Sequence, residues 1–357
     1  MIARAREWAI RLALVAASLA AFVGLLELWL ASRDLPRDAG TLLVPHPVSP
    51  RLVRLAPDTT ARFTGVSVRA NRYGYRGPEW PIERPPGAFR IAFLGDSQTF
   101  GYAVDENDTY PAQLERRLRA AHPDTAWEAL NFAMVGFNTS QEAEACSLDV
   151  RPFAPDLVLL GFFMNDVDTP VRPVDVAPAE APADAGGAAG RARRGGIASA
   201  ARSLRATQFL RTRAAALARR AGLARGTATA RYRELFVSRS PAWRACEAGI
   251  RAIRDESAAR GARFAVVILP FIVSLDATYP MAEAHRQVSE LCAAEGIACL
   301  DLLPAFLGKP ADRLCVTPIN NHMNAEGNQI AADALFEWLA RGDLLLLRPA
   351  GGTGKSP

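Results

Sequence analysis

Histidine is scarce in this sequence, and two common cofactor signatures are missing. The 357 residues include only four histidines, which are His46, His122, His285 and His322. No G-x-G-x-x-G motif follows the first expected strand, which argues against a dinucleotide-binding dehydrogenase. No carboxylate–histidine cluster has metal-ligand spacing, which argues against a metal-dependent phosphoesterase. The sequence therefore predicts neither a metal nor another cofactor.

The five cysteines form no C-x-x-C pair and show no zinc-ligand spacing. Because their number is odd, at least one thiol is free or pairs with another chain. Cys292 and Cys299 flank an expected helix-to-strand turn. Two interpretations stay open for them, namely an exported disulfide or burial as small apolar side chains.

Acidic residues are absent from residues 191–233, which contain twelve arginines. The net charge of +5 therefore comes from one Ala/Gly/Arg-rich stretch rather than from the whole chain. Nucleic-acid-binding proteins spread positive charge over a folded face, so we expect no nucleic-acid partner. The stretch is interpreted as a solvated linker. A lid, or a basic arm near anionic lipid headgroups, is the alternative.

One long apolar run is present near the N-terminus. Residues 12–26 are apolar or small without interruption, and after Glu27 the run continues to Ala31. Its length approaches the ~20 residues that span a bilayer, and the preceding arginines keep the N-terminus in the cytoplasm. We therefore predict that residues 1–32 form a cytoplasmic N-terminus and a single inner-membrane anchor, with the rest of the chain periplasmic or extracellular. A cleaved signal peptide is the alternative.

Beyond the anchor, composition divides the chain into further parts. Residues 33–88 are rich in proline and arginine and predict a linker with short extended segments. Residues 89–345 alternate between apolar strand-like runs and helical spacing. A low-complexity insertion at about 170–235 interrupts this domain. Residues 346–357 are expected to form a flexible tail.

The alternation within residues 89–345 predicts a layered domain. Strands are expected at Arg90–Gly95, Ala129–Ala133, Asp156–Phe163, Phe264–Leu269 and Ile297–Leu300. Helices are expected at Tyr110–Ala121, Ser140–Val150, Ala242–Arg260, Met281–Glu295 and Ala325–Leu339. Strands separated by helices favour parallel pairing. The predicted fold class is α/β, a three-layer α/β/α sandwich around a parallel sheet, with an N-terminal transmembrane helix.

Residues suited to chemistry follow the first three strands, at the edge where open parallel sheets form their sites. After Gly95, a sharp turn would present the Ser97 hydroxyl beside backbone N–H groups. Gly136 follows the second strand and could bring its N–H close to a substrate oxygen. Asn165 follows the third strand and could donate from its amide. Each residue also has an ordinary interpretation, as an N-cap, a turn glycine or an Asx turn.

His322 lies just before the last expected helix. It can act as a base only if it reaches Ser97. The other three histidines are poorer candidates, because they lie in the linker, at the end of a helix or within a helix.

The segments around Ser97, Gly136, Asn165 and His322, in this order along the chain, resemble the SGNH (GDSL) hydrolase family in its membrane-anchored bacterial form. The resemblance covers roughly residues 90–340. It implies that Ser97 is the nucleophile and first oxyanion donor, and that His322 is the general base. Gly136 and Asn165 would be the second and third oxyanion donors. The resemblance also implies a flavodoxin-like fold and a serine esterase that hydrolyses a carboxylic ester, for example an O-acetyl group on a glycan, through an acyl-serine.

One position departs from the family pattern. An aspartate usually lies two or three residues before the histidine, where this chain has Ile319 and Asn320. An asparagine can accept a hydrogen bond from imidazole but carries no charge, and loss of that charge can cost several orders of magnitude in rate. A main-chain carbonyl near residues 318–320, or the side chain of Asp312 or Asp168, is an alternative partner for the ring.

Two other functions stay open on the sequence alone. An O-acyltransferase acting on an envelope polysaccharide would use the same residues, because water exclusion separates it from a hydrolase. A catalytically weak binding module would fit the missing aspartate. The expected partners are a small-molecule or glycan ester and the membrane, and the oligomeric state is left open.

Overall fold

The computed structural model describes most of the chain beyond residue 41. The described residues are 42–63, 65–168, 227–236, 240–317 and 320–345, together with scattered positions between 8 and 29. Internal contacts divide the chain into two units. The first comprises residues 1–37 and 180–225, and the second comprises residues 38–179 and 226–357.

The first unit is described only at helical positions between Trp8 and Trp29. Among the described residues, no helix is both long enough and apolar enough to cross a membrane. Parts of the predicted anchor within residues 1–32 lie outside the described residues, so the anchor stays a prediction. The expected solvated stretch up to residue 226 and the expected tail at 346–357 also lie outside them.

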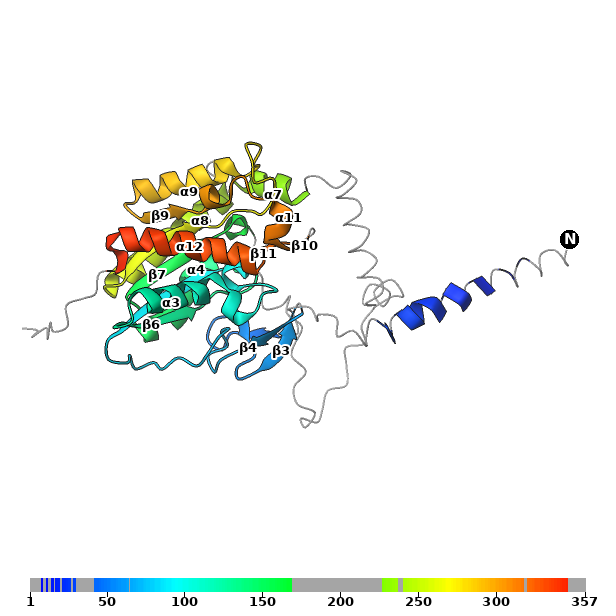
Figure 1. Cartoon of the computed structure of the whole chain (residues 1–357), viewed down its shortest axis with the longest axis horizontal. Coiled ribbons are helices and arrows are strands. Elements are labelled where there is room, and N and C mark those ends of the chain that lie inside the picture. Colours follow the sequence, from blue (N-terminus) through cyan, green and yellow to red (C-terminus); the bar gives the residue numbers. More distant parts are fainter. Residues whose placement is uncertain are drawn as a thin grey trace, which may run out of the picture. The chain divides into compact units, whose positions relative to one another are not determined.

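The second unit is built around a parallel sheet of five strands (Figure 1). These are β5 (Ala88–Gly95), β6 (Ala126–Asn131), β7 (Leu157–Phe162), β8 (Arg263–Ile268) and β9 (Ala298–Asp301). Their order in the sheet is β6-β5-β7-β8-β9, and every pairing is parallel. This is the 2-1-3-4-5 order of flavodoxin-like folds. The predicted parallel α/β sandwich is therefore confirmed.

Helices cover both faces of this sheet. These helices are α3 (Tyr110–Ala121), α4 (Thr139–Ala145), α8 (Pro241–Ala259), α9 (Ala282–Ala294) and α12 (Ala325–Arg341). α3 contacts α12, and α4 contacts α8. Right-handed crossovers place α3 on one face and α4 and α8 on the other, because the chain reverses its direction across the sheet after β6. The predicted helix 140–150 ends as the π turn η3 (Cys146–Val150).

Shorter elements join these parts. The short helices are α2 (Ser97–Phe100), α7 (Thr227–Leu235), α10 (Leu303–Phe306) and α11 (Ala311–Leu314). The 3₁₀ turns are η2 (Glu106–Asp108), η4 (Arg151–Phe153), η5 (Met164–Val167) and η7 (Asp343–Leu345). Three antiparallel hairpins pair β1 (Leu43–Pro45) with β2 (Val53–Leu55), β3 (Thr60–Phe63) with β4 (Val66–Arg69), and β10 (Cys315–Thr317) with β11 (Asn320–Met323).

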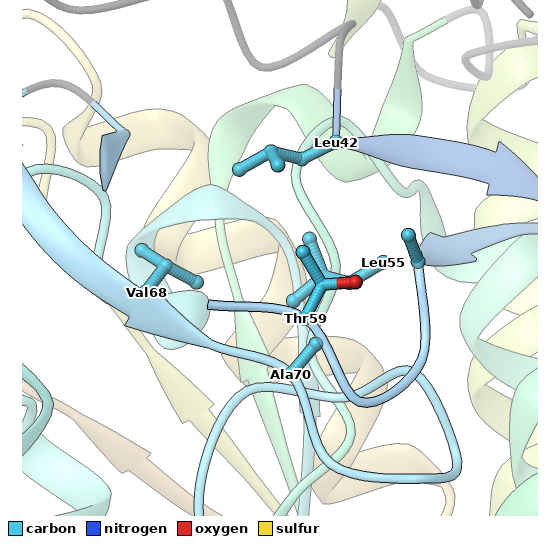
Figure 2. A pocket seen from close by; sticks show the side chains of 6 residues that line it. Leu42, Leu55, Thr59, Val68 and Ala70 are labelled. Atoms are coloured by element: carbon cyan, nitrogen blue, oxygen red, sulfur yellow. The ribbon is translucent and has the colours of Figure 1, made fainter. Parts of the chain in front are cut away.

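A small apolar cleft lies among the N-terminal hairpins, between β1 and β2 on one side and β3 and β4 on the other (Figure 2). Its volume is about 10 Å³, and its lining is Leu42, Leu55, Ala56, Thr59, Val68 and Ala70. None of these residues belongs to the predicted site, so the cleft belongs to the packing of the hairpins.

The central strands form the core. Every residue of β5 and β7 is buried, as expected for parallel strands that are covered on both faces. β6 lies earlier in the chain than the predicted 129–133. At its start Trp127 packs on Phe89 of β5, with ring centroids 5.0 Å apart. After its end the chain stays beside β5, because the Phe132 N–H donates to the Phe93 carbonyl at 2.8 Å.

A buried arginine joins this sheet to the segment that precedes it. Arg90 is fully buried, and its Nε lies 2.6 Å from Oε2 of Glu128 on the neighbouring strand. The guanidinium also donates to the carbonyls of Pro81, Ile82 and Phe153. A buried charge is tolerated when it is paired and hydrogen-bonded. The network therefore fastens the segment before β5 to the sheet.

We predict that Arg90→Met lowers the free energy of unfolding by about 3–5 kcal/mol, because it leaves Glu128 and the main-chain carbonyls around the guanidinium without their partner. Chemical denaturation followed by circular dichroism measures this change. Arg341→Met is the control, because its ion pair with Glu337 is exposed and such pairs contribute little. Equal stability of the Arg90→Met and wild-type proteins would contradict the role of the network.

Candidate active site

Ser97 lies at the carboxyl end of the central strand β5, where α2 begins. Asp96 caps this short helix, because its Oδ1 accepts a hydrogen bond from the Gln98 N–H at 2.8 Å. Gly95 has a φ of +152°, and a Cβ there would lie 2.3 Å from Thr99 Oγ1. Only glycine fits this turn without displacing its neighbour. The turn holds Ser97 nearly buried, with 8% of its surface exposed.

His322 reaches Ser97 from a different part of the fold. It lies on β11, in the hairpin that precedes α12. Its Nε2 is 2.7 Å from Ser97 Oγ, although the two residues are 225 positions apart in the chain. The structure therefore brings the predicted nucleophile and the predicted base into hydrogen-bond contact.

Asn320 holds the other ring nitrogen of His322. Its Oδ1 lies 2.5 Å from His322 Nδ1 and also accepts the His322 backbone N–H at 3.2 Å. A backbone N–H only donates, so it is the oxygen of the Asn320 amide that faces His322. Since this oxygen only accepts, Nδ1 carries the ring proton and Nε2 keeps its lone pair toward Ser97. Asn320 thus sets the tautomer that a base requires, without adding a charge.

The surroundings of the His322 ring favour its neutral form. Burial lowers the pKa of His322 to about 4. One face of the ring stacks on Tyr102, with centroids 4.3 Å apart and an angle of 22° between the planes. Of the expected partners of Nδ1, the Asn320 side chain is the one found in contact with it among the described residues, and residues 318 and 319 lie outside them. The ring is therefore neutral near pH 7 and able to accept a proton.

The other two predicted residues follow the strands on either side of β5. Gly136 follows β6 and has a φ of +80°, a conformation that favours glycine. Asn165 lies in η5 after β7, and its side-chain amide helps to lower the pKa of the nearby Asp96 carboxyl against the effect of burial. Because β6, β5 and β7 are adjacent and parallel, Gly136, Ser97 and Asn165 all lie at one edge of the sheet.

Three carboxyl groups of this region are buried, namely those of Asp96, Glu142 and Asp166. Burial raises the pKa of Asp96 to about 6, against hydrogen bonds that lower it. Burial, and then the charge of Asp96, raises the pKa of Glu142 well above its ordinary value. Burial and the charge of Glu142 do the same for the pKa of Asp166. Burial therefore disfavours the ionised forms of Glu142 and Asp166.

Sequence reasoning did not single out two side chains that contact His322 or its neighbours. Tyr102 stacks on the ring, and Gln98 hydrogen-bonds to the backbone of Asn321 and Met323. Both follow Ser97 closely in the chain, but they meet β11 only through the tertiary structure. No local pattern therefore marks them.

His285 belongs to a separate network. Its Nδ1 lies 2.7 Å from Asp301 Oδ1, and its Nε2 lies 3.1 Å from the Tyr279 hydroxyl. These contacts join α9, β9 and the loop before α9, away from the serine. In the part of the chain that the structure describes, no group of three or more His, Cys, Asp or Glu side chains could hold a metal ion.

The chain matches a known family model. The model of the GDSL-like lipase/acylhydrolase family matches residues 93–330. No curated protein sequence matches the chain.

Several solved structures are similar to the chain at low identity. A two-domain esterase active on acetylated mannans has 14% identity and a TM-score of 0.45; the match covers 75% of this chain but only 54% of that esterase. TesA has 15% identity and a TM-score of 0.42, and the match covers 72% of this chain and 99% of TesA. A catalytic mutant of Axe2, an acetylxylan esterase from Geobacillus stearothermophilus, has 16% identity and a TM-score of 0.43. The match covers 70% of this chain and 93% of Axe2. The chain thus spans about half the length of the two-domain esterase.

We predict that Asn320→Asp raises the pKa of His322 by about 1–3, because an adjacent carboxylate favours the protonated ring. NMR titration of the ring measures this pKa, which lies at about 4 in the unchanged protein. Asn107→Asp in η2 adds the same charge at an exposed position and is the control. The contact between Asn320 and His322 would be contradicted by an Asn320→Asp protein whose His322 titrates as before.

Proposed function

We propose that this chain, which belongs to the GDSL-like lipase/acylhydrolase family, hydrolyses a carboxylic ester through an acyl-serine intermediate. The observation that carries this proposal is the 2.7 Å contact between Ser97 Oγ and His322 Nε2. A serine hydroxyl becomes a nucleophile when an adjacent base takes its proton. The neutral imidazole of His322, in the tautomer that Asn320 selects, is such a base.

In the first step, Ser97 Oγ attacks the ester carbonyl carbon while His322 Nε2 takes the hydroxyl proton. The ring becomes a cation, and Asn320 Oδ1 keeps its hydrogen bond to the Nδ1–H. Because Asn320 is neutral, it stabilises this cation less than a carboxylate would. We therefore expect slower turnover than in serine hydrolases that have an aspartate at this place.

The negative charge that develops on the carbonyl oxygen needs hydrogen-bond donors. In this proposal they are the backbone N–H groups of Ser97 and Gly136 and the side-chain amide of Asn165. An amide nitrogen carries two N–H groups, so Asn165 can hold Asp96 with one and the oxyanion with the other. Donors that are held in place before the reaction stabilise the transition state without reorganisation.

In the remaining steps, His322 Nε2 first donates a proton and then accepts another. His322 Nε2 returns its proton to the alcohol oxygen, and the alcohol leaves as the acyl-serine forms. A water molecule then gives a proton to Nε2 and attacks the acyl carbonyl. Collapse of the second tetrahedral intermediate releases the acid and restores the Ser97 hydroxyl.

The proposal predicts that Ser97→Ala and His322→Ala each lower the hydrolysis of p-nitrophenyl acetate by about 10³-fold or more, because the two residues act as a unit. Initial rates of the purified protein measure this. His122→Ala is the control and should keep the wild-type rate, because His122 is exposed at the end of α3. The ratio of acetate to butyrate turnover measures the preferred acyl size.

Other outcomes of this experiment would favour the alternative functions. A wild-type rate equal to that of Ser97→Ala would contradict simple ester hydrolysis. Turnover that requires an added glycan or other alcohol would instead indicate an O-acyltransferase, in which the acceptor replaces water. Binding of a glycan ester without turnover would indicate a binding module.

We further predict that Asn165→Ala lowers kcat by about 10²–10³-fold with little change in KM, because an oxyanion donor acts mainly in the transition state. Steady-state kinetics with p-nitrophenyl acetate measure both constants. A raised KM with an unchanged kcat would show that Asn165 binds substrate and transition state equally.

A further inference from the structure

One side chain beside the nucleophile contacts the backbone on both sides of the base. Gln98, the residue after Ser97, donates from Nε2 to the Asn321 carbonyl at 3.3 Å. Its Oε1 accepts a hydrogen bond from the Met323 N–H at 3.1 Å. Asn321 and Met323 flank His322, so a single side chain spans the strand segment that carries the base.

The two contacts allow only one orientation of the Gln98 amide. The Met323 N–H can only donate, so it faces the amide oxygen, and the Asn321 carbonyl can only accept, so it faces the amide nitrogen. Gln98 is only 3% exposed. Water therefore competes little for these bonds, and a buried group that lost its partner would be left unsatisfied.

The main chain of Gln98 belongs to the turn that presents the nucleophile. Its N–H donates to Asp96 Oδ1 at 2.8 Å, as part of the cap of α2. The side chain of the same residue belongs to the surroundings of β11. Gln98 therefore links the serine turn directly to the histidine strand.

Asn320 cannot set the distance between the nucleophile and the base, because it lies on β11 together with His322 and moves with it. Among the described residues, the hairpin β10–β11 pairs only within itself and does not join the five-stranded sheet. The far side of the strand is held where Asn328 Nδ2 donates to the Met323 carbonyl at 3.0 Å. Among the described residues, Gln98 hydrogen-bonds to this strand from the side of Ser97.

We propose that Gln98 is a positioning residue that sets the distance between Ser97 Oγ and His322 Nε2, an inference that rests on the proposed ester hydrolysis. Gln98 acts through the backbone of Asn321 and Met323 and does not touch the reacting atoms. A misplacement of about 1 Å between reacting groups can cost about 10²-fold in rate. Two hydrogen bonds that hold the strand in register therefore act on kcat.

Gln98→Leu removes both hydrogen bonds at similar side-chain volume. We expect kcat for p-nitrophenyl acetate to fall about 10- to 100-fold in the full-length protein, with KM changed less than about twofold. Gln113→Leu is the matched control. Gln113 is also buried, and its Nε2 donates to the carbonyls of Asp108 and Ala325, not to the neighbours of His322. It should keep the wild-type kcat.

Gln98→Glu separates positioning from a general packing role. A protonated carboxyl can donate to Asn321 and accept from Met323 as the amide does, whereas an ionised carboxyl repels the Asn321 carbonyl. We expect the activity relative to wild type to be near one at low pH. It should fall as pH rises through the pKa of the introduced carboxyl, which burial raises. Asp96 and His322 titrate beside this position, so the ratio to the wild-type profile is the quantity measured.

Hydrogen–deuterium exchange of the Met323 N–H provides a readout that is independent of turnover. Gln98→Leu should speed this exchange by about fivefold, the factor that corresponds to the net loss of one hydrogen bond of about 1 kcal/mol, and Gln113→Leu should not. Unchanged exchange overturns the proposal whatever the activity. Wild-type kcat in Gln98→Leu also overturns it, provided that turnover still depends on Ser97. Turnover that no longer depends on Ser97 would instead contradict the proposed function. In that case the hydrogen–deuterium exchange of the Met323 N–H is the measurement that tests the role of Gln98.

Discussion

The hydrogen bond between Ser97 and His322 is the contact on which the candidate site depends. It joins residues 225 positions apart, one at the end of the central strand β5 and the other on a hairpin outside the main sheet. Asp96 holds the turn that carries the serine, and Asn320 holds the ring of the histidine. In our inference Gln98 connects these two halves. The flavodoxin-like sheet supplies the rigid edge against which they are held.

Burial favours the neutral forms of several ionisable groups around the site. Burial lowers the pKa of His322 and raises the pKa values of Glu142 and Asp166. The partner of the imidazole is an amide rather than a carboxylate. An unpaired charge is costly in such surroundings, so neutrality favours a stable resting state. Asn320 still sets the orientation and tautomer of the His322 ring. The imidazolium that forms in the transition state receives less electrostatic stabilisation from this amide than it would from a carboxylate.

Two buried arginines, Arg90 and Arg76, join the segment before β5 to the rest of the domain. Arg90 ties that segment to the start of β5. Arg76 donates to the carbonyls of Phe100 at the end of α2 and of Gly101 and Val104 in the loop that follows it. Burial lowers the pKa of Arg76 to about 10, so the guanidinium stays charged near neutral pH. The residues interpreted from sequence as a linker with short extended segments thus help to hold the loop that follows the serine helix.

Local sequence by itself determined the elements and the candidate residues of this protein. Apolar runs and helical spacing depend on neighbouring residues, and alternation with right-handed connections led to the parallel sheet. Ser97, Gly136 and Asn165 could be named because the ends of adjacent parallel strands lie at one edge. The sequence named His322 as the base only on the condition that it reaches Ser97. The packing of β11 against α2 and α12 meets this condition, and it depends on contacts between residues far apart in the chain.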